Sequence, residues 1–138
     1  GTVSVSSDYT IRSRTLIHEY LKCHCLNKSL AEHVQAKTPP QKMDLLSEDA
    51  RLVPTALGDL RLLSAMISDL EPDGRSIPVL LRQYLRLGGT MVSFNVDSEF
   101  GDTLDCLVVV DLHNAPERLM ARYCGTPPKS LAEQVADT

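Results

Sequence analysis

The sequence predicts an α+β (α/β) fold in which helices pack against a small sheet. Three segments have the alternating or continuous apolar pattern of strands, at residues 2–9, 90–96 and 103–112. Between and after them, apolar residues recur at the three- and four-residue spacing of helices. The chain has 138 residues, of which 43% are hydrophobic. One domain with one core is therefore expected.

The first strand is expected within TVSVSSDY, residues 2–9, because Val3 and Val5 alternate with polar residues. Asp8 or Thr10 can then cap a helix, since short polar side chains accept the free N–H groups of a first turn. The expected buried face of this helix consists of Ile17, Tyr20, Leu21 and either His24 or Cys25. We expect the helix to end near residues 26–27.

The middle of the chain is less regular until residue 60. A short helix is expected at 29–32, and Thr38-Pro39-Pro40 should end it. A helical stripe follows, formed by Leu60, Leu63, Ile67 and Leu70. Residues 71–74, Glu-Pro-Asp-Gly, predict a turn after this helix.

A further helix is predicted at residues 77–87, with Ser76 as its N-cap and Pro78 in its first turn. Its expected apolar positions are Ile77, Leu80, Leu81, Tyr84 and Leu85. Gly88 lies where a left-handed C-terminal cap is favoured. Gly88 and Gly89 follow a helix, whereas a phosphate-binding loop precedes one, so they are expected to be a cap.

The last two strands are expected to form an antiparallel hairpin, because only residues 97–102 join them. The first arm should place Val92, Phe94 and Val96 on one face and Met91, Ser93 and Asn95 on the other. The second arm, 103–112, is apolar on both faces and therefore predicts an interior strand. A last helix should begin at Pro116, and residues 126–138 are expected to be a tail or linker.

Charge and composition restrict the function. The net charge of −4 argues against nucleic acid as a partner, because nonspecific binding of phosphates needs a basic excess. No apolar run approaches the roughly 20 residues of a transmembrane helix. Reduced thiols are expected for the four cysteines, since Cys106 lies inside an apolar strand. A cytoplasmic location is predicted, and peripheral contact with the inner face of the membrane remains open.

Two clusters contain residue types that bind metals, but no metal is expected at either. Cys23-His24-Cys25 lies on a predicted helix, where residues two apart point in different directions. Asp97, Glu99, Asp102 and Asp105 gather at the hairpin tip. Their spacing is not that of a calcium-binding EF-hand loop, and a solvated tip explains them.

Two polar groups leave a choice between a ligand site and ordinary surface. Arg75, Arg82 and Arg86 could hold a phosphate or carboxylate, or they could form an exposed helix face. The second group is Ser4, Ser6, Ser7, Asp8 and Tyr9. It lies at the end of a strand that leads into a helix, a common ligand position, although a helix cap also explains Asp8.

Most of the chain resembles one bacterial family. GTVSVSSDYTIRSRTLIHEYL at the start, IPVLLRQYLRLGGTMVSFNVDSEFGDTLDCLVVVDL at 77–112 and RLMARYCG at 118–125 carry the resemblance. The family consists of proteins named as hemolysins, which are similar to the ornithine-acyl-carrier-protein N-acyltransferases. Their fold is that of the GCN5-related N-acetyltransferases (GNAT).

The resemblance implies that residues 1–125 are the C-terminal half of a GNAT-like domain. The strand within 2–9 would be strand five, residues 10–25 the fourth helix, and the hairpin the last two strands. Residues 28–87 would be a helical insertion. The donor-binding pattern Q/R-x-x-G-x-G/A is not found in this sequence. A natural chain starts with Met, so Gly1 indicates either a processed tag or a chain that is part of a longer protein.

The implied activity is transfer of a fatty acyl group to an amine such as ornithine, in ornithine-lipid synthesis. The co-substrate would be an acyl-carrier-protein or CoA thioester, with no tightly bound cofactor. By position, Asp8 and Tyr9 would be catalytic, and Ser6, Ser7, Arg82 and Arg86 would bind substrate or carrier protein. Without the donor half, this chain alone is expected to be inactive.

Two other functions are weighed against this one. The chain could be a noncatalytic interaction domain that docks a partner such as acyl carrier protein. A membrane-lytic hemolysin is disfavoured, because the net charge is negative and no strongly basic amphipathic segment is found. If the first-half strands are missing, strand five has an unpaired edge, so the isolated chain is expected to form a homodimer.

Overall fold

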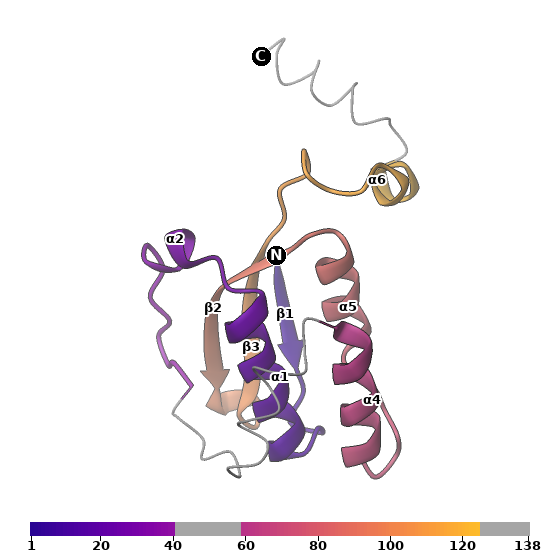
Figure 1. Ribbon diagram of the computed structural model, residues 1–138. Coiled ribbons are helices and arrows are strands. Elements are labelled where there is room, and N and C mark those ends of the chain that lie inside the picture. The colour runs from indigo at the N-terminus through magenta and orange to yellow at the C-terminus, as the bar shows by residue number, and fades with distance from the viewer. Residues whose placement is uncertain (41–58, 125–138) are drawn as a thin grey trace.

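The computed structural model describes residues 1–40 and 59–124 and confirms the α+β class (Figure 1). The elements in order are β1 (Thr2–Val5), α1 (Ile11–His24), α2 (Lys28–Ala31), α4 (Leu60–Leu70), α5 (Val79–Arg86), β2 (Thr90–Asp97), the 3-10 turn η1 (Ser98–Phe100), β3 (Thr103–Val109) and α6 (Glu117–Cys124). Part of the expected insertion, 41–58, and the expected tail, 126–138, lie outside the described residues.

The three strands form one antiparallel sheet in the order β1-β3-β2. Strand β3 is therefore the interior strand, as its doubly apolar pattern predicts. It pairs with β2 through the predicted hairpin, which η1 closes, and Gly101 adopts a left-handed conformation at that turn. On its other side it pairs with β1, where Val3 lies opposite Cys106.

The core lies on one face of the sheet. Helix α1 crosses that face (Figure 1), and its buried side includes Leu16, Ile17 and Leu21. Helices α4 and α5 contribute to the same core. The largest fully buried side chains are Leu16, Ile17, Leu21, Leu63, Ile67, Leu81, Met91, Met120, Val5 and Val108. Aliphatic side chains thus do the packing that aromatic residues do in many domains.

The edge of the sheet at β2 is covered by chain segments. The Met91 N–H donates to the Cys25 carbonyl at 2.7 Å, and the Asn27 N–H donates to the Met91 carbonyl at 2.8 Å. At the other end of β2, the Val96 N–H donates to the Thr38 carbonyl at 2.8 Å. Residues 25–38 therefore run beside β2 and satisfy part of its backbone.

The edge of the sheet at β1 is open among the described residues. The Gly1 amino group donates to the Val108 carbonyl at 2.9 Å, and the Val108 N–H donates back to Gly1 at 2.8 Å. Backbone hydrogen-bonding groups along an antiparallel strand point to alternate sides. The N–H and C=O groups of Val3 and Val5 therefore point towards β3, as those of Gly1 do. The backbone groups of Thr2 and Ser4 then point outward, where no described strand pairs with them.

Two predicted helix caps are confirmed. The Thr10 hydroxyl accepts the Ser13 N–H at 3.2 Å, which makes Thr10 the N-cap of α1. Gly88 has φ +80° at the end of α5, the left-handed conformation that glycine adopts most easily. Gly89 has a different role, because a Cβ there would lie 2.7 Å from the Tyr84 carbonyl oxygen.

The predicted start of α5 is wrong. Helix α5 begins at Val79 after Pro78, and none of the described side chains caps it. A proline disfavours helical geometry in the residue before it, so a helix cannot easily run from Ser76 through Ile77. The predicted burial of Leu80 is also wrong, since its side chain is 52% exposed. The buried face of α5 centres on Leu81. Adjacent residues of a helix point about 100° apart, so the side chain of Leu80 points away from the core.

The predicted alternation of β2 fails at its beginning. Met91 and Val92 are both buried, although they were expected on opposite faces. The pairing with β3 shifts register between Met91 and Ser93, and such a bulge turns one residue out of the regular alternation. From Ser93 onward the pairing with β3 is regular, and Phe94 is buried, but Asn95 and Val96 are both partly exposed.

The thiols are expected to differ strongly in reactivity. Burial raises the pKa of Cys106 to about 12 and that of Cys25 to about 11, whereas Cys23 is exposed. The thiolate is the reactive form, so a thiol reagent at pH 8 should modify Cys23 first. The measurement uses a Cys124→Ser variant, so that only Cys23, Cys25 and Cys106 can react. Equal rates for Cys23 and Cys106 without denaturant would contradict the packing of β3.

Candidate functional site

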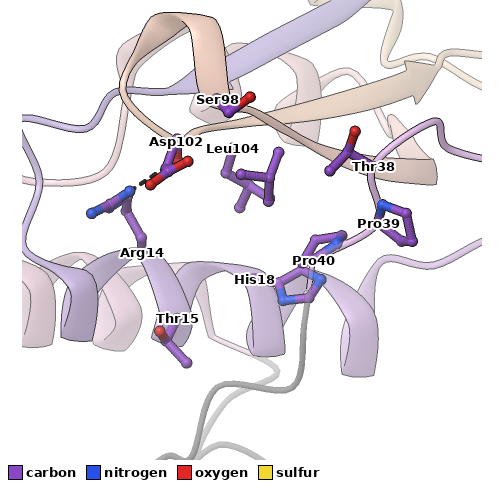
Figure 2. Close-up of a pocket in the computed structure, with 10 residues that line it drawn as sticks. Arg14, Thr15, His18, Thr38, Pro39, Pro40, Ser98, Asp102 and Leu104 are labelled. Atoms are coloured by element: carbon purple, nitrogen blue, oxygen red, sulfur yellow. Dashed lines mark hydrogen bonds between the residues drawn. The ribbon is translucent and has the colours of Figure 1, made fainter.

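A cavity of about 400 Å³ lies between α1, the tip of the β2–β3 hairpin and residues 38–40 (Figure 2). Its lining residues are Arg14, Thr15, His18, Thr38, Pro39, Pro40, Val96, Ser98, Asp102 and Leu104. Helix α1 supplies three of them at neighbouring positions of one face, because residues three and four apart lie above one another. The volume is in the range of small-molecule sites.

Arg14 is the cationic group of this cavity. One terminal nitrogen, Nη1, donates to the Asp102 carbonyl oxygen at 2.9 Å. Its Nε–H is buried and has no hydrogen-bond partner among the residues that the structure describes. A buried donor without an acceptor costs free energy, and a guanidinium is well suited to bind an oxyanion through two parallel bonds. Arg14 therefore gives the cavity a positive charge, whereas its Nε–H is covered by protein atoms.

The carbonyl that Arg14 holds belongs to an unusual backbone position. Asp102 has φ 61°, the positive φ that a non-glycine residue rarely adopts. It follows Gly101, which is also left-handed. The Arg14 hydrogen bond links α1 to this turn and fixes where the Asp102 residue meets the cavity.

His18 contributes a neutral ring to the same cavity. Burial lowers its pKa to about 4, and the nearby positive charge of Lys22 acts in the same direction. Its ring meets the Phe94 ring edge-on, with centroids 4.6 Å apart. At neutral pH, His18 therefore adds no positive charge beside Arg14.

The remaining lining residues form an apolar wall with a few hydroxyl groups. Val96, Leu104, Pro39 and Pro40 supply the apolar surface. The Thr15 hydroxyl donates to the Ile11 carbonyl at 2.7 Å. An arrangement with one charged end and an apolar wall is suited to binding a small amphipathic molecule.

Two sequence-predicted site residues, Tyr9 and Arg82, meet at Ser76. The Tyr9 hydroxyl donates to the Ser76 carbonyl, and the Arg82 Nη2 donates to the Ser76 hydroxyl at 3.0 Å. Burial raises the pKa of Tyr9. The Arg75 guanidinium lies over the Tyr9 ring, 5.3 Å from its centroid. These contacts tie the β1–α1 loop to the start of α5, and they lie apart from the cavity.

The other predicted site residues are dispersed. The Ser6 hydroxyl accepts the Asp8 N–H at 3.1 Å, and the Asp8 side chain is exposed. Ser7 lies against the hairpin tip, because a Cβ on Gly101 would be 3.0 Å from its hydroxyl. Arg86 lines a separate pocket with Arg118 and Arg122. The structure thus does not gather the six predicted residues into one site.

Within residues 1–40 and 59–124, no group of three or more His, Cys, Asp or Glu side chains could hold a metal ion. No helix in these two ranges is long and apolar enough to cross a membrane.

Arg14 and His18 were not predicted as site residues from the sequence. Their signal was present, since a cation and a histidine four residues apart share one helix face. It was hidden because nothing in the sequence shows that the hairpin tip and residues 38–40 come to this face. Comparisons of the chain with family models, curated proteins and solved structures find no match.

Proposed function

We propose that this chain is the C-terminal half of a GNAT-like N-acyltransferase domain. The complete domain would transfer a fatty acyl group from an acyl-carrier-protein or CoA thioester to an amine such as ornithine. The observation that carries the proposal is the difference between the two edges of the sheet. The β2 edge is covered by residues 25–38, whereas the β1 edge is open among the described residues.

An open edge strand with exposed backbone groups favours pairing with another strand. In the proposed domain, β1 is strand five, and strand four would lie along the outward groups of Thr2 and Ser4. Helix α1 then corresponds to the fourth helix, and β2 and β3 to the last two strands. The thioester-binding loop would precede this chain, which is consistent with the missing Q/R-x-x-G-x-G/A pattern.

The chemistry of amide formation needs a base for the amine and donors for the oxyanion. Of the two candidates after β1, Asp8 is the better base. Its side chain is exposed, whereas the Tyr9 hydroxyl already donates to the Ser76 carbonyl. In the proposed domain Asp8 would lie at the end of strand five, close to where strands four and five separate.

The proposed pairing can be tested by hydrogen exchange of the β1 amides. We expect the Thr2 and Ser4 amides to exchange rapidly in this chain at low concentration and slowly in the longer protein. The Val3 and Val5 amides are the internal control, because they face β3 and should be protected in both. Rapid exchange at Thr2 and Ser4 in the longer protein would reject the strand assignment. An acyl-transfer assay of the longer protein and its Asp8→Asn variant tests the activity itself.

One observation favours the alternative of a noncatalytic docking domain. Arg86 on α5 and Arg118 and Arg122 on α6 line one open pocket. Grouped arginines favour an acidic partner such as acyl carrier protein. Binding of carrier protein by the longer protein, without any acyl transfer, would support this alternative over the enzyme.

A further inference from the structure

Three arginines from two helices line one open pocket of about 790 Å³. Arg86 belongs to the last turn of α5, and Arg118 and Arg122 belong to α6, which lies near that end of α5 (Figure 1). Pro116 and Leu119 are the other described residues of the lining, so none of the described lining residues is acidic. The pocket is therefore positive in a chain whose net charge is −4.

The usual reasons for a surface arginine explain only part of this cluster. Arg86 and Arg122 lie in the last turns of their helices, where the negative end of the helix dipole favours cations. Arg118 lies in the first turn of α6, because the helix begins at Glu117, and the dipole disfavours a cation there. Arg118 and Arg122 are also four residues apart on one helix face, where like charges repel. A bound anion would offset both unfavourable effects.

The geometry of the guanidinium groups restricts the kind of anion. Each guanidinium is a planar fork that binds two oxygens along one edge, and a carboxylate has only one such edge. A phosphate group has its oxygens around a tetrahedral centre, so forks that come from two helices can bind it from different directions. Arg86, Arg118 and Arg122 are all exposed, so a ligand in solution can reach their donor groups.

We propose that this pocket binds a small soluble phosphate compound with two or more negative charges, such as a diphosphate. The three arginines bind the phosphate oxygens, and Pro116 and Leu119 lie beside the rest of the ligand. A protein partner would need a surface of roughly 800 Å² on each side, whereas only five described residues line this pocket. The proposal does not depend on acyl transfer by the complete domain.

The experiment is a titration of the full chain, labelled with ¹⁵N, with inorganic pyrophosphate as the probe at constant ionic strength. We expect the backbone amide peaks of Arg86, Arg118 and Leu119 to shift until the site is saturated, whereas the peaks of α4 should not move. Citrate carries a similar charge on carboxylates. It should bind at least about fivefold more weakly, because each carboxylate offers one edge to one fork.

Two variants test the contribution of each helix. Arg86→Gln and Arg118→Gln each remove one charged fork from an exposed position, and each should weaken pyrophosphate binding by about tenfold. Arg61→Gln is the matched control, because it removes the same charge from an exposed position of α4 outside the pocket. It should bind pyrophosphate as the unmodified chain does. The urea unfolding midpoints of the three variants check that each is folded.

The inference is overturned if pyrophosphate shifts none of these peaks at millimolar concentration, or if citrate binds as tightly as pyrophosphate. It is also overturned if both pocket variants bind pyrophosphate with unchanged affinity. Vesicles of phosphatidylcholine and phosphatidic acid test a lipid headgroup as the source of the phosphate. Binding of the chain to these vesicles without binding of pyrophosphate would overturn the inference in favour of a membrane surface.

The same titration of the longer protein separates this inference from the proposed function. Pyrophosphate binding by a longer protein that transfers no acyl group would reject the proposed function and leave this inference intact. Acyl transfer without pyrophosphate binding would reject this inference alone.

Discussion

Replacing Glu71 with alanine is expected to lower the free energy of unfolding by about 2–4 kcal/mol. Glu71 ends α4 and is only 5% exposed. Its Oε1 accepts the Thr10 N–H at 2.8 Å and the Thr10 hydroxyl at 3.2 Å. Because Thr10 caps α1, this carboxylate also lies at the positive end of that helix. Alanine would remove a charge-assisted acceptor and leave a donor at the start of α1 unsatisfied.

Urea unfolding of Glu71→Ala measures this loss of stability, and two further variants serve as comparisons. Glu71→Gln keeps an oxygen acceptor but loses the charge, so it should lose less stability than alanine does. Asp69→Ala removes an exposed carboxylate from the same helix and should change stability by about 0.5 kcal/mol or less. Equal unfolding midpoints for Glu71→Ala and Asp69→Ala would show that the link to Thr10 contributes nothing.

The role of Glu71 illustrates what local sequence patterns leave out. Glu71-Pro72-Asp73-Gly74 predicts a turn, and Gly74 does adopt a positive φ there. The pattern does not show that this turn meets the start of α1, 61 residues earlier in the chain. Turn chemistry is local, whereas the partner of a buried carboxylate is set by tertiary packing.

The elements that were predicted correctly have strong local causes. The helix with the stripe of Leu63 and Ile67 buries both residues, and Gly88 adopts the left-handed cap. The interior position of β3 follows from its apolar residues on both faces. In each case one periodicity or one backbone preference is sufficient to define the structure.

The errors occurred where two local preferences compete. Ser76 is a good cap by residue type, but Pro78 restricts the residue between them, and the helix begins after the proline. Ser76 instead receives hydrogen bonds from Tyr9 and Arg82. In β2, a bulge breaks the two-residue alternation, and no residue in the strand marks it as glycine would.

The candidate site was less predictable than the fold. Its lining comes from α1, from the hairpin tip and from residues 38–40, which are far apart in sequence. The unpaired Nε–H of Arg14 is a property of packing, and residue type alone does not reveal it. Asp102 was noticed only as one of four carboxylates at the tip, although its position beside Arg14 distinguishes it from the others.

His18 is expected to make the protein less stable in mild acid. Its pKa is lowered from 6.5 to about 4 in the folded chain, chiefly by burial. Between these two pH values the unfolded chain takes up a proton that the folded chain does not, so stability is present above pH 6.5 and is lost as the pH falls towards 4. The gap between the pKa values corresponds to about 3 kcal/mol, and partial solvent screening reduces our expectation to about 2 kcal/mol.

The measurement compares urea unfolding at pH 7 and pH 4.5 for the unmodified chain and for His18→Gln, which carries no titrating ring. Carboxylates titrate in the same range, but they do so in both proteins and cancel in the difference. His33→Gln is the matched control, because His33 is exposed and should keep the acid sensitivity of the unmodified chain. If His18→Gln loses as much stability in acid as His33→Gln does, the ring is not shielded by Phe94 and the cavity walls as described.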